Sequence, residues 1–221
     1  MSLQIHNIPM GMGRAYLIES KTALVLVDAG LPYHERKVLR RMQALGRCDL
    51  RLIFITHAHL DHYGSAAALR RLTGAPIAIH RADGDAMARG ETRIGSTRGW
   101  GRLTWPFFRL FVPLLRSEPT APDILLDDGD DLQTYGLDAV VHHTPGHTPG
   151  SSCLVVAGRL AFVGDLVSTN GRPHVQRYFA DDWSLMPGSF ARLQALRPEW
   201  IYTGHGRNPL RGEVVHRLNP E

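Results

Sequence analysis

Short apolar runs alternate with polar, glycine-bearing turns along most of the chain. Runs of this length that are rich in Val, Ile and Leu are typical of buried strands. They predict strands at residues 15–19, 23–28, 52–55, 76–79, 124–126, 132–134, 139–143, 152–157, 159–163 and 200–203. Apolar residues at helical spacing predict helices at 36–45, 65–72, 82–89 and 190–196. Strands and helices that alternate through 221 residues indicate an α/β fold, and this length suits one large domain.

Residues 91–118 interrupt this pattern. No acidic residue lies between Glu91 and Glu118, whereas the interval holds five arginines beside tryptophan, phenylalanine and leucine. We interpret it as an insert that forms a loop and a short amphipathic helix. Two roles remain open for it. It is either a lid that selects a small-molecule substrate with an apolar tail, or an element that covers the core or joins two copies in a homodimer.

The strand predicted at 52–55 runs directly into His57, His59, Asp61 and His62. Imidazole and carboxylate groups are the ligands that zinc and similar divalent metals prefer. A strand end followed by a tight turn can aim His57 and His59 one way and the next two side chains another. That arrangement suits two neighbouring metal sites better than one.

Three further candidate ligands each follow an apolar run. They are His147 in Thr-Pro-Gly-His-Thr-Pro-Gly, Asp165 in Val-Gly-Asp and His205 in Thr-Gly-His-Gly. The glycines beside them, Gly146 and Gly204 among others, are expected to permit tight turns. Because these loops all end strands, we expect their side chains to meet the His57 cluster.

In their order along the chain, the HxHxDH, TPGHTPGS, GD and TGHG motifs resemble those of the metallo-β-lactamase-fold hydrolase superfamily. The resemblance extends from about residue 14 to residue 208, and it points to the glyoxalase II-like and lactonase-like dinuclear branch. It implies a four-layer αββα sandwich formed by residues 1–221 as a single domain. Periodicity alone supports only an α/β fold.

The resemblance also implies a role for each candidate ligand. One metal is held by His57, His59 and His147, and a second by Asp61, His62 and His205, with Asp165 bridging both. Two divalent ions are expected, with zinc as the first choice and iron or manganese as alternatives. Asp61 is the candidate catalytic residue, which accepts a proton and returns it to the leaving group.

A bridging hydroxide between two such metals is a nucleophile near neutral pH. We therefore expect a dinuclear metal-dependent hydrolase of a carboxylic ester, thioester or lactone. The β-lactamases of the family generally lack the bridging aspartate, so Asp165 argues against that activity. Lactonases often place a tyrosine three residues after it, where this chain has Ser168, and Tyr178 is a candidate substitute. The alternatives left open are a mononuclear iron oxygenase like the persulfide dioxygenases, a phosphodiesterase and a non-catalytic binding protein.

Other residues are candidates for supporting roles. Asp28 is expected to hydrogen-bond a ligand imidazole and fix its tautomer, and Thr56 and Thr148 are weaker candidates for the same role. The remaining histidines near apolar runs, His80, His143 and His174, are better interpreted as structural or surface residues.

Composition bounds the partners and the compartment. The net charge is +4, but the basic residues are scattered, so no nucleic-acid partner is expected. No apolar run is long enough to span a membrane, and residues 1–13 lack the pattern of a signal peptide, which favours a cytoplasmic location. Cys48 and Cys153 have no CxxC partner, so a reducing compartment fits.

Overall fold

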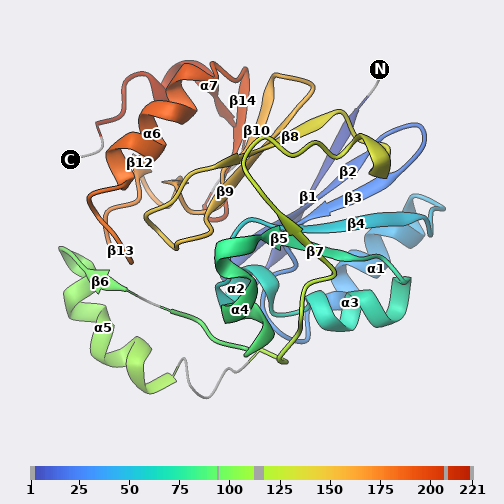
Figure 1. Cartoon of the computed structure of the whole chain (residues 1–221), viewed down its shortest axis with the longest axis horizontal. Coiled ribbons are helices and arrows are strands. Elements are labelled where there is room, and N and C mark those ends of the chain that lie inside the picture. The colour runs from blue at the N-terminus through green and yellow to red at the C-terminus, as the bar shows by residue number, and fades with distance from the viewer. Residues whose placement is uncertain (1–2, 94, 112–116, 207–208, 220–221) are drawn as a thin grey trace.

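A computed structural model describes residues 3–93, 95–111, 117–206 and 209–219 of the chain (Figure 1). Two sheets face each other, and helices cover their outer faces. The first sheet has the order β1-β2-β3-β4-β5-β7, and its strands are β1 Gln4–Met10, β2 Gly13–Glu19, β3 Leu24–Val27, β4 Leu50–Ile55, β5 Ile77–His80 and β7 Ile124–Leu126. Strands β1 to β3 run antiparallel, whereas β3, β4, β5 and β7 are parallel. The helices α1 Glu35–Ala44, α3 Ala66–Thr73 and α4 Arg81–Ala88 lie between its strands in the chain.

The second sheet has the order β15-β14-β10-β9-β8, with β8 Ala139–His143, β9 Ser152–Val156, β10 Leu160–Phe162, β14 Trp200–Tyr202 and β15 Leu210–Arg211. Its helices are α6 Met186–Ala195 and α7 Gly212–Val215. Two small ribbons complete the fold, one formed by β11 Val167–Ser168 and β12 His174–Val175, the other by β6 Ser96–Thr97 and β13 Phe179–Ala180.

Successive side chains of the strands point to opposite faces of each sheet, and they form three apolar clusters between the four layers of helices and sheets. In β3, Leu24 and Leu26 pack in one cluster with residues of α1 and α3, whereas Val25 and Val27 pack in the cluster between the two sheets. A third cluster joins the outer face of the second sheet to α6 and α7. Because successive side chains of a strand point to opposite faces, one sequence can supply two cores. The result is the αββα sandwich that the motifs implied.

Most predicted strands and helices are confirmed to within a few residues, but one strand prediction is wrong. Residues 132–134 were expected to be extended, whereas the structure has a 3₁₀ helix, η2 Gln133–Tyr135. The Asp131 Oδ1 atom accepts a hydrogen bond from the Gln133 amide, which closes a turn here. Leu132 is fully buried and anchors that turn, so its apolar character did not indicate a strand. The strand β1 was not predicted, because it mixes polar and apolar residues at the edge of its sheet.

The predicted insert contains a helix, α5 Trp100–Phe111, that stands apart from the two sheets (Figure 1). Residues 112–116 of the insert lie outside the described residues. Within the part of the chain that the structure describes, no helix combines the length and the apolar character needed to cross a bilayer.

Candidate metal centre

The loops at the ends of four strands, together with one short helix, deliver the seven predicted ligands. His57 and His59 follow β4, and Asp61 and His62 lie on the helix α2 Leu60–Tyr63. The other three lie between β8 and β9, after β10 and after β14 (His147, Asp165 and His205). The structure brings all seven together, in three overlapping groups whose nitrogen and oxygen atoms lie within 4.8 Å of one another.

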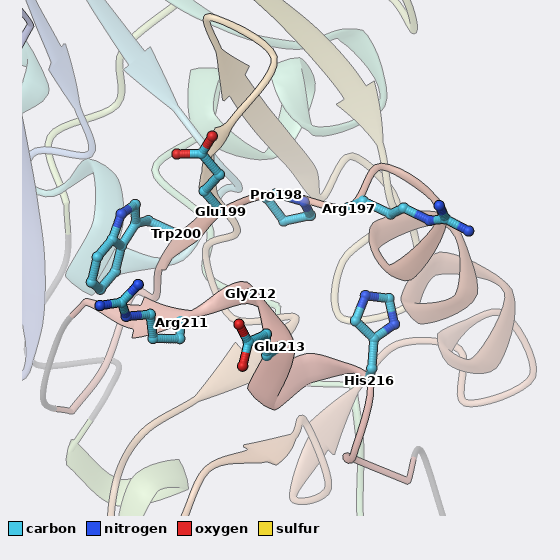
Figure 2. A pocket seen from close by; sticks show the side chains of 8 residues that line it. All are labelled: Arg197, Pro198, Glu199, Trp200, Arg211, Gly212, Glu213 and His216. Atoms are coloured by element: carbon cyan, nitrogen blue, oxygen red, sulfur yellow. The ribbon is translucent and has the colours of Figure 1, made fainter.

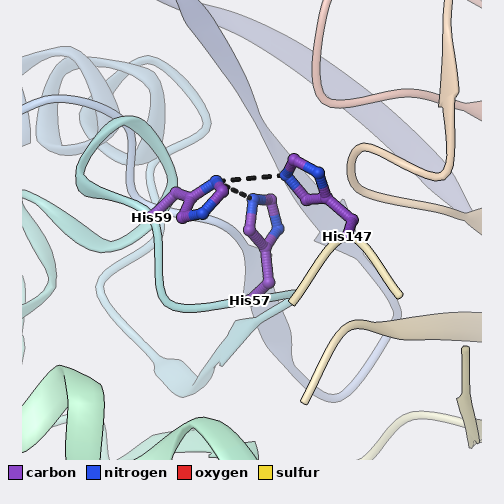
Figure 3. A group of neighbouring side chains, drawn as sticks. All are labelled: His57, His59 and His147. Atoms are coloured by element: carbon purple, nitrogen blue, oxygen red, sulfur yellow. Dashed lines mark hydrogen bonds between the residues drawn. The ribbon is translucent and has the colours of Figure 1, made fainter. Parts of the chain in front are cut away.

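The first group consists of three buried imidazoles that face one another (Figure 3). The His59 Nδ1 atom lies 3.1 Å from the His57 Nε2 atom and 3.1 Å from the His147 Nε2 atom. These three nitrogens surround one small volume. This set matches the predicted first site.

The second group joins Asp61, His62 and His205, as predicted. The His205 Nε2 atom lies 3.3 Å from Asp61 Oδ2, and the His62 Nε2 atom lies 3.9 Å from the same oxygen. Asp165 lies between the two groups. Its Oδ2 atom is 3.5 Å from His147 Nε2 and 3.2 Å from His205 Nε2, and its Oδ1 atom is 3.3 Å from His62 Nε2.

Backbone carbonyls fix the tautomers of three of these histidines. In each of them, the ring nitrogen that points away from the cluster contacts a backbone carbonyl oxygen. His59 Nε2 lies 2.5 Å from Arg93 O, His147 Nδ1 lies 2.8 Å from Phe179 O, and His205 Nδ1 lies 2.9 Å from Met12 O. A carbonyl oxygen can only accept, so each of these outer nitrogens carries the proton and donates it. In a neutral imidazole the inner nitrogen is then a free lone pair that points into the cluster.

Asp28 and Thr56 do the same for the other two imidazoles, as predicted. The His62 Nδ1 atom lies 2.9 Å from Asp28 Oδ2, and the His57 Nδ1 atom lies 3.0 Å from Thr56 Oγ1. The Thr56 hydroxyl donates to Asp28, 3.0 Å away, and therefore accepts from His57. In their neutral forms, all five imidazoles thus turn a lone pair inward, which is the arrangement that metal-binding histidines need.

Burial and charge divide the centre into two electrostatic halves. Burial lowers the pKa of His57, His59 and His147, that of His147 to about 4, so the first group stays neutral. Burial also opposes charge on His62, but the carboxylates of Asp28, Asp165 and Asp61 outweigh it and raise the pKa of His62 to about 10. Burial likewise opposes charge on His205, but Asp165 and Asp61 raise its pKa well above the ordinary value. Without a metal, His62 and His205 therefore carry protons on their inner nitrogens, and the same negative charge favours a divalent cation that would displace those protons.

Two buried polar atoms in the centre have no hydrogen-bond partner among the described residues. They are His62 Nε2 and Asp165 Oδ1, and both point into the cluster. A buried polar atom without a partner costs about 1–3 kcal/mol, which a bound cation removes. The donor set of five imidazoles and two carboxylates therefore fits divalent metal ions such as zinc.

Asp83 is a supporting residue that the sequence did not single out. Its carboxylate is buried, and it accepts hydrogen bonds from the Ala58 amide at 2.8 Å, the Thr148 hydroxyl at 2.7 Å and the Gly150 amide at 2.7 Å. It therefore joins the loop that carries His57 and His59 to the loop that carries His147. Thr148, predicted to contact a ligand imidazole, contacts Asp83 and Ser151 instead.

Gly204 is needed for space rather than for a left-handed backbone. A Cβ atom there would lie 2.5 Å from Asp165 Oδ1 and 2.5 Å from His62 Cε1. Any side chain would therefore displace two candidate ligands. Gly146 does adopt a positive φ, of 129°, as a tight turn requires.

The remaining candidates lie outside the cluster. The His80 and His143 rings stack on each other at 3.9 Å, which is a structural role. The centroids of the Tyr178 and His174 rings lie 5.7 Å apart, and none of the described metal groups includes either residue.

A separate pocket of about 350 Å³ lies near the C-terminal end of the chain (Figure 2). It is lined by Arg197, Pro198, Glu199, Trp200, Arg211, Gly212, Glu213 and His216. None of the seven candidate ligands lines it, and the Arg211 guanidinium stacks 4.4 Å from the Trp200 ring centroid. It is therefore distinct from the candidate metal centre.

Sequence comparisons identify related proteins for most of the chain. A family model described as "Metallo-beta-lactamase superfamily" matches residues 8–205. A hydroxyacylglutathione hydrolase of Aeromonas hydrophila is 31% identical over 86% of this chain, which spans 59% of that enzyme's length. The uncharacterized protein ML0493 of Mycobacterium leprae is 32% identical over 98% of this chain and 97% of its own. An acyl-coenzyme A thioesterase, MBLAC2 of Bos taurus, is 30% identical over 69% of this chain and 57% of its own.

Solved structures show the same architecture. The protein TTHA1623, crystallised in a di-iron-bound form, is 28% identical, with a TM-score of 0.72 and coverage of 98% of both chains. A metallo-β-lactamase of Cronobacter sakazakii with a HARLDQ motif is 27% identical, with a TM-score of 0.70 over 91% of this chain and 75% of its own.

Proposed function

Because this chain belongs to the metallo-β-lactamase superfamily of metal-dependent hydrolases, we propose that it is a dinuclear enzyme that cleaves a carboxylic ester, thioester or lactone. One observation carries the proposal. Five imidazoles each aim one ring nitrogen into the same cluster, and Asp165 lies between the two groups that they form. The proposal takes residues 1–221 as one domain, since both halves of the chain contribute to this cluster.

In this proposal His57, His59 and His147 hold one ion, Asp61, His62 and His205 hold the other, and Asp165 contacts both. Bound divalent ions would polarise a carbonyl oxygen and lower the pKa of water to roughly 7. Zinc suits the donor set, and the di-iron form of TTHA1623 keeps iron as the alternative. Manganese is a third choice.

The residues of the chain itself supply orientation and proton transfer. The Asp61 side chain is 18% exposed and that of His205 is 16% exposed, whereas His62 is fully buried. A substrate therefore approaches from the side of Asp61 and His205. In this proposal Asp61 accepts a proton and returns it to the leaving alkoxide or thiolate.

Thioesters are the first substrate class to test. The relatives named hydroxyacylglutathione hydrolase and acyl-coenzyme A thioesterase support this choice. The tryptophan, phenylalanine and leucine residues of the insert support an apolar acyl group. The first residues of the insert, Thr92 and Arg93 (its root), contact the centre. The Arg93 carbonyl accepts from His59, and the Thr92 hydroxyl accepts from the Leu60 amide at 2.9 Å. We propose that α5 acts as a lid beside this root.

The test combines metal counting with a substrate panel. The purified chain, loaded with zinc or iron, is expected to hold about two ions per chain, as a two-metal site requires. It should hydrolyse acyl thioesters, esters or lactones in preference to a nitrophenyl phosphodiester. His205→Ala is expected to lower the count to about one ion, whereas the matched control His143→Ala, outside the cluster, keeps both. One ion in the wild-type chain, or oxygen consumption with a persulfide substrate, would refute the proposal.

A further inference from the structure

Helix α5 carries three of the large exposed apolar side chains of the described residues. Trp100 and Leu103 are each 71% exposed, and Leu110 is 67% exposed. At about 100° per residue, these three positions fall within a stripe about 80° wide, and Pro106 lies within the helix between Leu103 and Leu110. Exposed large apolar side chains that gather on one helix mark a surface that binds something else.

The segment that carries this stripe is basic in sequence. Residues 92–117 contain five arginines and no acidic residue. Arg93, Arg98 and Arg102 are exposed. On the helix, Arg102 lies about 120° from the middle of the stripe, which is about 80° beyond its edge, so it does not interrupt the stripe. The helix is therefore amphipathic with an apolar face and a basic flank.

The base of α5 is held while the helix itself stands apart from the two sheets (Figure 1). Strand β6 pairs with β13, the Arg98 amide donates to the Tyr178 carbonyl at 3.0 Å, and the Arg98 guanidinium lies 4.4 Å from the Trp183 ring centroid. The backbone of Gly101 also lies close to residue Tyr178, since a Cβ atom at Gly101 would lie 2.5 Å from Tyr178 O. These contacts hold the first turn of α5 against residues 178–183.

We propose that α5 docks on the surface of a bilayer that is rich in anionic phospholipid. An interfacial helix places its apolar face at the boundary between headgroups and acyl chains, while arginines on its flank contact lipid phosphates. No membrane-spanning helix is needed for this mode of binding. A second copy of this chain fits less well, because a symmetric pair of α5 helices would bring the Arg98 and Arg102 side chains of both copies near each other. The inference does not depend on which bond the metal centre cleaves.

Docking would also bring the metal centre to the lipid surface. The segment that leads to β6 contacts the centre directly through the bond between the Arg93 carbonyl and the His59 ring. Strand β13, its pairing partner, provides the Phe179 carbonyl that accepts from His147. The ribbon that supports α5 therefore also orients two candidate ligands.

The experiment is vesicle co-sedimentation of the full chain. Vesicles of phosphatidylcholine alone are compared with vesicles in which phosphatidylglycerol is added. The chain is expected to sediment with the mixed vesicles. It should be released as the salt concentration rises from about 0.1 M to about 1 M, because the Debye screening length falls from about 10 Å to about 3 Å. The double variant Leu103→Ser/Leu110→Ser should bind at least about tenfold more weakly.

A matched control removes exposed leucines elsewhere. Leu72 is 61% exposed on α3 and Leu125 is 45% exposed on β7, so Leu72→Ser/Leu125→Ser should bind as the wild type does. Circular dichroism of each variant verifies that it is folded. Sedimentation of the chain with neither vesicle, equal binding to both, or unchanged binding of the α5 variant would overturn the proposal. So would a dimer in solution that the α5 substitutions dissociate, because the stripe would then belong to a second copy.

Discussion

Replacing Asp83 tests whether the two loops of the first metal group depend on one buried carboxylate. Asp83→Asn keeps the shape of the side chain, but it can present only one acceptor oxygen. If that oxygen stays with the Ala58 amide and the Thr148 hydroxyl, the new NH₂ group faces the Gly150 amide, 2.7 Å from the present Oδ1 atom. Two donors then meet in a buried site, and one or both lose their acceptor.

The magnitude follows from these three hydrogen bonds. A hydrogen bond to a charged group contributes about 1.5–3 kcal/mol, and a buried unpaired donor costs about 1–3 kcal/mol. Asp83→Asn loses one such bond, weakens two by removing the charge, and leaves the Gly150 amide unpaired. We expect it to lower the free energy of unfolding by about 2–4 kcal/mol. The affinity of the first metal group should fall about 10- to 100-fold, because its loops lose their common support.

Denaturant unfolding of the metal-free chain measures the first effect, and zinc competition with a chromophoric chelator measures the second. The matched control is Asp85→Asn on the same helix, because the Asp85 side chain is 94% exposed and should change neither quantity. The reasoning is refuted if Asp83→Asn unfolds at the wild-type denaturant concentration. It is also refuted if the variant is destabilised but binds both ions with wild-type affinity, because Asp83 would then support the fold alone.

Three further outcomes are expected. Asp28→Asn should weaken zinc binding about 10- to 100-fold in the same competition assay, because the carboxylate that orients His62 is lost; unchanged affinity would contradict this role. Removing the ions with a chelator should lower Tm in calorimetry by about 16–32 °C relative to the chain with free zinc at about 1,000 times Kd, since each of the two sites then contributes about 4 kcal/mol. Failure of added zinc to restore Tm would count against a reversible site. Replacing Trp100–Phe111 with a Gly-Ser linker should raise KM for long-chain acyl thioesters more than for short ones, and an unchanged chain-length preference would exclude the lid.

The sequence was most informative where strands end. An apolar run followed by His57 or Asp165 marks both the strand and the side chain that leaves it, because turn residues and ligands are specified by residue type. The error at residues 132–134 has the same origin: one buried leucine serves a turn as well as it serves a strand, and the pattern of apolar residues does not separate the two.

The chain by itself therefore determined the order of the elements, the seven candidate ligands and the family resemblance. Only the tertiary structure decided how the ligands are oriented. The carbonyls that hold His59, His147 and His205 lie 34, 32 and 193 residues away, and a backbone oxygen has no residue-type signature. The same holds for Asp83, whose partners lie up to 67 residues away. Ligand identity is a property of side chains, whereas ligand orientation depends on which distant backbone atoms the fold brings beside them.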